Sequence, residues 1–217
     1  LTGGKPLPSQ VLAQVIAKTD GVPLFVEELV KTVLESGVLR EEEGEYRLDG
    51  PLLPVTIPST LQGSLMARID RLSTVKEVVQ VASALGRQFS YELISAVSPM
   101  GGIALERELD RLVEAELLYQ RGVPPQATYT FKHALIQDAA YESLLRRRRE
   151  ETHAAIARAL MERFPEVVET QPELVAHHLT SARRAEEALP YWKSAGNRAV
   201  ERSANTEAIG HFGKALD

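Results

Sequence analysis

The sequence predicts a mainly α protein with small β-hairpins, and three observations support this prediction. Apolar residues recur at helical spacing along most of the 217 residues. Short strand-like runs flank an acidic turn near residue 43 and a proline-containing loop near residue 124. The final part combines small and aromatic residues at the spacing of a helical repeat. We expect three domains, over residues 1–57, 58–146 and 147–217.

Composition excludes several classes of protein. Hydrophobic residues make up 44% and charged residues 25% of the chain, as in ordinary globular domains. Cysteine is absent, which rules out disulfides and thiolate metal sites. The formal net charge is −5, and no apolar stretch approaches the roughly 20 residues of a membrane span, so we expect neither nucleic-acid nor membrane partners. No signal peptide begins at Leu1, and we expect a cytoplasmic segment of a longer protein.

Residues 1–57 predict a helical domain built around a Gly-x-Pro turn. The first helix opens at Pro8-Ser9, and the second runs from about Pro23 to Glu35. Gly21 permits a backbone conformation closed to other residues, and Pro23 fits the first helical position. A β-hairpin and an extended linker over 51–58 follow. The residues of the second helix expected to point outward are Glu27, Glu28 and Lys31.

Residues 58–146 have the order of a winged helix. Helices are expected from Ser59, from Ser73 and after Phe89-Ser90, followed by a helix with Leu105, Leu109, Leu112 and Val113 on one face. Two strands, 117–121 and 128–131, form the expected hairpin. In a DNA-binding version the helix before the hairpin reads the bases, but here it carries five acidic and two basic residues. We therefore expect it to pack against protein.

Residues 147–217 contain one clear repeat signature. The first repeat helix carries Trp192, Ala195, Gly196 and Ala199, and the second carries Ala208, Phe212 and Ala215. This pattern resembles the tetratricopeptide repeat (TPR), in which small residues let two helices approach closely. The resemblance implies a protein or peptide ligand. We expect a degenerate repeat over 171–182 and further repeats beyond Asp217.

We expect no catalytic residues and no metal site in this segment. Gly3-Gly4-Lys5 fails as a phosphate-binding loop, because Pro6 occupies the Ser/Thr position and no earlier glycine is available. Adjacent His177 and His178 point about 100° apart on a helix and are predicted to be structural.

Two other groups of polar residues are also predicted to have no chemical role. His153 and His211 lie within helical patterns and are expected only to pack. The basic run Arg146–Arg149 is predicted to be a solvated junction, since Glu150 and Glu151 follow at once. A contact of this run with phosphate or nucleic acid is the alternative.

Two short motifs resemble those of the signal-transduction ATPases with numerous domains, which are AAA/NB-ARC-like. The run Asp20–Leu29 resembles their Gly-x-Pro motif, whose proline packs against bound nucleotide. The run Phe131–Leu135 resembles their Met-His-Asp segment, whose histidine reaches the ADP phosphates, although Ala134 replaces the aspartate. The resemblance implies that Gly21, Val22, Pro23 and His133 form one wall of an ATP or ADP site. The alternatives are an ordinary helix junction at Pro23 and a capping role for His133.

Over the whole chain, the resemblance is to the helical, winged-helix and TPR region of bacterial adenylate/guanylate cyclase–ATPase–TPR fusion proteins. It implies a regulatory segment that covers the nucleotide of an upstream ATPase core and relays its state to the repeats. The phosphate loop is absent, so we expect this segment alone to bind no nucleotide. The alternatives are a relay segment of an ATP-dependent transcription regulator and a TPR-type interaction scaffold.

Overall fold

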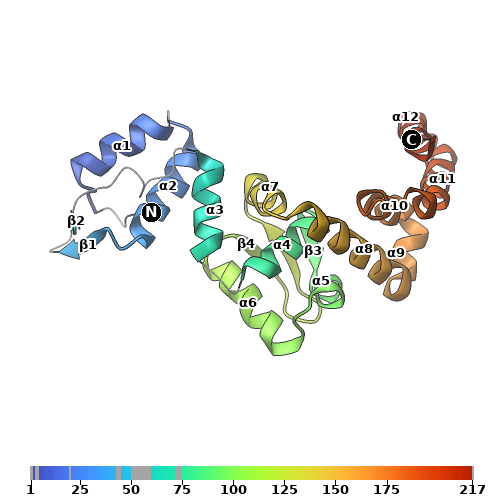
Figure 1. The fold of residues 1–217 in the computed structure, drawn as a ribbon, viewed down its shortest axis with the longest axis horizontal. Coiled ribbons are helices and arrows are strands. Elements are labelled where there is room, and N and C mark those ends of the chain that lie inside the picture. The colour runs from blue at the N-terminus through green and yellow to red at the C-terminus, as the bar shows by residue number, and fades with distance from the viewer. Residues whose placement is uncertain are drawn as a thin grey trace. The chain divides into compact units, whose positions relative to one another are not determined.

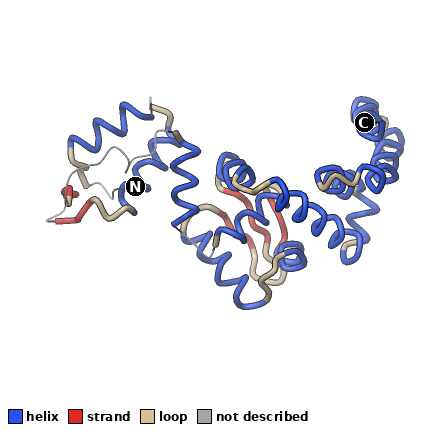
Figure 2. The backbone as a smooth tube through the Cα atoms, in the orientation of Figure 1, coloured by secondary structure: helices blue, strands red, loops and turns tan. Residues whose placement is uncertain are grey.

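The computed structural model describes residues 2, 5–19, 21–42, 45–49, 60–71 and 75–216. These residues form two compact units, 1–76 and 77–217 (Figure 1). Helices dominate both units, and the described strands form two small antiparallel sheets (Figure 2). The predicted mainly α fold is confirmed.

The two units divide the chain differently from the three predicted domains. The predicted boundary at 57/58, the linker over 51–58 and the predicted helix starts at Ser59 and Ser73 fall outside the described residues. Helix α3 (Leu61–Arg71) belongs to the first unit, although the prediction placed it with the winged helix. The predicted boundary at 146/147 lies inside the second unit, at the start of helix α8.

The first unit packs its helices and a hairpin around one apolar core. Helix α2 begins at Pro23 and ends at Glu35, as the sequence predicts. Strands β1 and β2 pair antiparallel, with Leu39 opposite Leu48. The bounds are α1 (Ser9–Thr19), α2 (Pro23–Glu35), β1 (Leu39–Glu42) and β2 (Glu45–Leu48). The core residues are Val11, Val15, Phe25, Leu29, Val30, Val33 and Leu39.

The second unit begins with the helix, strand and hairpin order of a winged helix. Its sheet has the strand order β3-β5-β4, and all pairs are antiparallel. The sequence does not predict strand β3, because Phe89-Ser90 indicates a helix start. Ser90 serves both elements: it ends β3, and its Oγ accepts a hydrogen bond from the backbone N–H of Leu93 at 3.2 Å. The bounds are α4 (Lys76–Leu85), β3 (Gln88–Ser90), α5 (Tyr91–Val97), α6 (Gly102–Glu114), β4 (Leu118–Arg121) and β5 (Thr128–Phe131).

The remaining helices of the second unit continue the core of the winged helix. Ala84 of α4 shares one apolar cluster with Ile156 and Leu160 of α8 and with Trp192 of α11. This shared core explains why no unit boundary falls at residue 146. The bounds are α7 (Ala134–Glu142), α8 (Arg146–Arg163), α9 (Pro165–Thr170), α10 (Pro172–Ser181), α11 (Ala185–Glu201) and α12 (Asn205–Leu216).

Helices α11 and α12 form the closely packed pair that the repeat signature predicts (Figure 1). A Cβ added to Gly196 of α11 would lie only 2.4 Å from the ring of Phe212 on α12. Only a residue without a side chain therefore allows this approach. Ala195 and Ala199 are buried beside it, which gives the small-residue positions their physical meaning.

Candidate functional site

The Gly-x-Pro turn is exposed and has a defined backbone. Gly21 has φ +73°, in the left-handed region, and a Cβ there would meet nothing within 4 Å. The glycine is therefore required by its backbone angle and not by lack of space. The N–H of Val22 donates to the carbonyl of Thr19 at 2.9 Å, and Pro23 occupies the start of α2. The side chains of Val22 and Pro23 face solvent, so a ligand can reach them.

A buried ion pair fixes the helix that carries this turn. Glu28 is only 1% exposed and Arg68 of α3 is 3% exposed, and Nη1 of Arg68 lies 2.8 Å from Oε2 of Glu28. One turn further along, the hydroxyls of Thr32 and Ser64 are hydrogen-bonded at 2.8 Å, also fully buried. The exposed turn therefore stands on a helix joined to α3 by two specific polar contacts.

The burial of Glu28 corrects the sequence prediction, which pointed it outward. Glu28 and Thr32 occupy positions i+3 and i+7 from Phe25, within the stripe that Leu29 and Val33 define. The signal was available in the spacing: a carboxylate within an apolar stripe requires a cation on the facing element. Arg68 occupies the matching position on α3.

His133 lies at the N-cap of α7, directly after strand β5. Its backbone is extended, with φ −132° and ψ 143°, and its side chain makes no capping hydrogen bond to α7. Its Nε2 is buried and has no hydrogen-bond partner among the described residues. A buried ring nitrogen without a partner is costly, and a ligand oxygen would satisfy it. The alternative of a histidine that caps α7 through its side chain has no support in these contacts.

The four predicted site residues lie in different units. Gly21, Val22 and Pro23 belong to the first unit, and His133 belongs to the second. Their joint contact with one nucleotide stays a prediction. Residues 3 and 4 of the rejected Gly-Gly-Lys run, and Asp20 of the Gly-x-Pro run, lie outside the described residues.

A cluster of polar rings in the second unit was missed by sequence reasoning. Nδ1 of His153 on α8 lies 2.8 Å from Nδ1 of His178 on α10, and the hydroxyl of Tyr141 on α7 lies 2.9 Å from Nε2 of His153. The ring of His177 stands edge-on to that of His153 at 5.9 Å. The contacts are compatible with the prediction that these histidines pack. The hydrogen bond between His153 and His178 joins two different helices, so no local sequence pattern predicts it.

Burial holds these histidines neutral. Desolvation lowers the pKa of His153 to about 4 and that of His178 to about 3, and neighbouring histidines add to both shifts. An Nδ1–Nδ1 hydrogen bond requires one protonated and one bare nitrogen, so the two neutral rings must take complementary tautomers. Within the described part of the chain, no group of three His, Cys, Asp or Glu residues is arranged to hold a metal ion.

Each arginine of the basic run Arg146–Arg149 has a partner within the second unit. Arg146 and Arg147 pair with the carboxylates four residues later on α8, at 3.1 and 2.9 Å. The guanidinium of Arg149 lies 4.3 Å from the ring centroid of Tyr141 and donates to the carbonyls of Tyr141 and Leu144. The carbonyl of Tyr141 belongs to the last turn of helix α7, so the cation sits where the helix dipole favours it.

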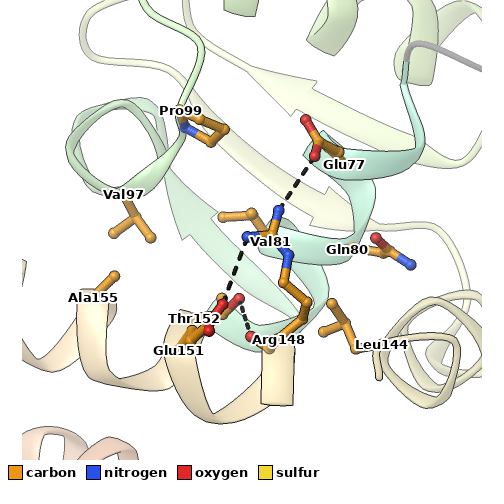
Figure 3. A pocket seen from close by; sticks show the side chains of 10 residues that line it. All are labelled: Glu77, Gln80, Val81, Val97, Pro99, Leu144, Arg148, Glu151, Thr152 and Ala155. Atoms are coloured by element: carbon orange, nitrogen blue, oxygen red, sulfur yellow. Dashed lines mark hydrogen bonds and ion pairs between the residues drawn. The ribbon is translucent and has the colours of Figure 1, made fainter. Parts of the chain in front are cut away.

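Arg148 spans a pocket of about 220 Å³ between α4, the end of α5 and α8 (Figure 3). Its guanidinium reaches Glu77 at 3.3 Å and Glu151 at 3.7 Å. Apolar side chains around Arg148 that line the pocket are Val81, Val97, Leu144 and Ala155 (Figure 3). Because two carboxylates already bracket the arginine, this pocket offers no surplus charge to a phosphate.

The chain is similar in sequence to part of a longer bacterial protein. The chain is 32% identical over 198 residues to an uncharacterised protein of Rhizobium meliloti (strain 1021). The match covers 91% of this chain but 19% of that protein, so the chain spans about a fifth of the relative's length. No known family profile matches the chain. In the described residues, no helix combines the length and apolar character needed to cross a bilayer.

Proposed function

We propose that this chain is a regulatory, signal-transmitting segment of a larger signalling ATPase, in which it covers the nucleotide of an upstream core. The observation that carries the proposal is the Gly21–Pro23 turn, which is exposed at its tip and fixed at its base by the Glu28–Arg68 ion pair. A wall of a nucleotide site needs this combination of access and rigidity. The similarity to a protein about five times longer supports the role of a segment.

His133 would supply the contact from the second unit. Its Nε2 lacks a partner among the described residues, and α7 begins at the next residue, where a helix N-terminus favours an anion. Because Nε2 is buried, contact with a phosphate requires the ring to turn outward. ADP contacted by Pro23 and His133 would favour a closed state, and exchange for ATP would release it. Such a switch operates only if the two nucleotides differ in affinity for the two states. The upstream catalytic domain in this proposal is a nucleotide cyclase.

The test is nucleotide exchange in the longer protein that contains the ATPase core. We expect His133→Ala to speed the release of a fluorescent ADP analogue by at least about tenfold, because a hydrogen bond to a charged group is lost. Pro23→Ala should act in the same direction. Pro165→Ala is the matched control, since Pro165 also occupies the first position of a helix, α9, but is not part of the proposed site.

Unchanged ADP release in both variants would exclude the nucleotide-covering role. The segment alone should show no tight ADP binding by the same fluorescence signal. Tight binding that depended on Pro23 in the isolated segment would contradict the need for an upstream core.

A second candidate is a TPR-type interaction scaffold without a nucleotide role. The close contact of Gly196 with Phe212 favours it, because this packing is what the repeat signature requires. A scaffold would bind its peptide equally well with and without ATP in the longer protein. The nucleotide-dependent switch predicts that ATP changes the affinity for the peptide.

A further inference from the structure

A groove lies where the end of α10, the start of α11 and the last turn of α12 meet. It consists of a pocket of about 210 Å³ and an adjoining open hollow, which share Thr180 and Ala185. We call it the α10–α12 groove. Its remaining lining residues are Ser181, Arg183, Leu189, Trp192, Lys214 and Ala215.

The charged side chains that line the α10–α12 groove are all cationic. They are Lys214 and Arg183, in a chain whose net charge is −5. Arg183 lies 3.2 Å from Glu150, but that carboxylate also pairs with Arg146. The two arginines and the one glutamate therefore carry a net positive charge. Lys214 forms no ion pair with any described residue. The groove therefore complements a negatively charged ligand.

The Lys214 ammonium is held in place by the aromatic floor of the groove. Its Nζ lies 4.6 Å from the centroid of the Trp192 ring, a cation–π contact. The indole is itself fixed, since its Nε1 donates to Oγ1 of Thr180 at 3.0 Å and its ring stacks on that of His211. A cation positioned before binding loses less side-chain entropy when a carboxylate arrives.

Beside this cation the groove is apolar and open. Leu189 is 48% exposed on α11, and Ala185 and Ala215 complete an aliphatic surface. The pocket has room for a single side chain of a partner rather than for a whole folded domain. Apolar burial with a flanking charge is the usual basis of peptide recognition in such grooves.

We propose that the α10–α12 groove binds an acidic peptide segment of a partner protein. An aliphatic side chain of that segment lies against Leu189 and Ala215, and its carboxylates meet Lys214 and Arg183. The biological meaning of this site rests on the proposed relay, for which it is the input. Its binding chemistry needs no nucleotide, so the two proposals fail separately.

The test uses the 217-residue chain and three short fluorescein-labelled peptides with leucine at the same positions. The remaining positions are all Glu in the first peptide, all Gln in the second and all Lys in the third. Fluorescence anisotropy should show the Glu peptide binding at least about tenfold more tightly than the Gln peptide, with the Lys peptide weakest. This preference should shrink as salt rises toward about 1 M, because exposed charges are screened.

Substitutions locate the site. Lys214→Glu and Arg183→Glu should each weaken binding of the Glu peptide by about tenfold, and Lys214→Gln should give a smaller loss in the same direction. Lys193→Glu makes the same change of charge on the exposed surface of α11, outside the groove lining, and should change affinity less than about twofold. Far-ultraviolet circular dichroism reports on the fold of each variant, because the emission of Trp192 also senses the Lys214 ammonium on its ring.

Three outcomes would overturn the proposal. Equal affinity for the Glu and Gln peptides would exclude charge complementarity, and equal losses in Lys193→Glu and Lys214→Glu would exclude the groove. A dimer in sedimentation that disappears in Lys214→Glu would identify a second copy of the chain as the occupant.

Discussion

Gly196 shows how a single residue sets the packing of the repeat. The added methyl group of alanine would meet the Phe212 ring at 2.4 Å, far below van der Waals contact, so α12 or the ring must move. We expect Gly196→Ala to lower the free energy of unfolding of the second unit by about 1–3 kcal/mol, the usual cost of overpacking. Urea denaturation followed by Trp192 emission measures it, because Trp192 lies one turn away on α11.

Gly213→Ala is the matched control on the facing helix. A Cβ at Gly213 would meet nothing within 4 Å, and the residue lies inside α12. Removing a glycine from a helix interior should stabilise the unit by about 0.5–1 kcal/mol. Destabilisation of similar size in both variants would show that the Phe212 contact is not the cause.

At the scale of elements, the Glu28–Arg68 pair is the joint between α2 and α3. Breaking one side leaves a buried charge without compensation. We expect Glu28→Ala to destabilise the first unit by about 3–5 kcal/mol, and the double variant Glu28→Leu with Arg68→Met to recover most of that loss. Hydrogen exchange of the α2 amides measures both effects.

The exposed pair of Arg40 with Asp49 provides the control for this joint. The two side chains are 65% and 52% exposed and lie 2.7 Å apart in the same unit. Asp49→Asn should change stability by less than about 1 kcal/mol, because exposed ion pairs contribute little. If Glu28→Ala has an equally small effect, the pair does not fix the helix.

The helices were predictable from local signals, and the polar contacts between them were not. Pro23 marks the start of α2 because it needs no N–H partner there, and Gly37, at φ +72°, marks the turn after it. Strand β3 is not predicted because three residues are too few to show an alternating apolar pattern. The strand is defined by its pairing with β5. The cation opposite Glu28 is forty residues away, a separation that no local pattern encodes.

For the candidate site, the sequence predicts the individual residues but not whether they come together in space. The backbone of Gly21 and the N-cap position of His133 follow from residue type and local order. The orphaned Nε2 of His133 depends on what surrounds the ring, which the sequence does not state. Local chemistry is therefore readable residue by residue, whereas burial is a property of the folded unit.

At the scale of the whole molecule, the two units should respond differently to acid. All five histidines lie between residues 133 and 211, in the second unit, and none lies in residues 1–76. The groups around the buried pair His153 and His178 are Tyr141, Arg149 and His177, and Lys214 in turn acts on His177. The cations and histidines among these groups oppose a further positive charge.

The sign of the pH effect follows from the lowered pKa values. Burial holds the pKa of His153 near 4 and that of His178 near 3, whereas both titrate near 6.5 when unfolded. The unfolded chain therefore binds more protons, and stability falls as pH drops below about 6.5 toward 4. At pH 5, keeping each of these two histidines neutral should lower the free energy of unfolding of the second unit by about 2 kcal/mol.

Hydrogen exchange at pH 7 and pH 5, corrected for intrinsic rates, separates the units. We expect protection of α8 and α10 to fall with acid, while α1 and α2 keep theirs, since no histidine contributes in the first unit. The variant with both His153→Gln and His178→Gln removes the titrating groups. Whatever its stability at pH 7, its second unit should lose much less between pH 7 and pH 5, because no buried base remains at those two positions. If the second unit of this variant loses as much stability between pH 7 and pH 5 as that of the unchanged chain, groups other than these two histidines cause the acid sensitivity.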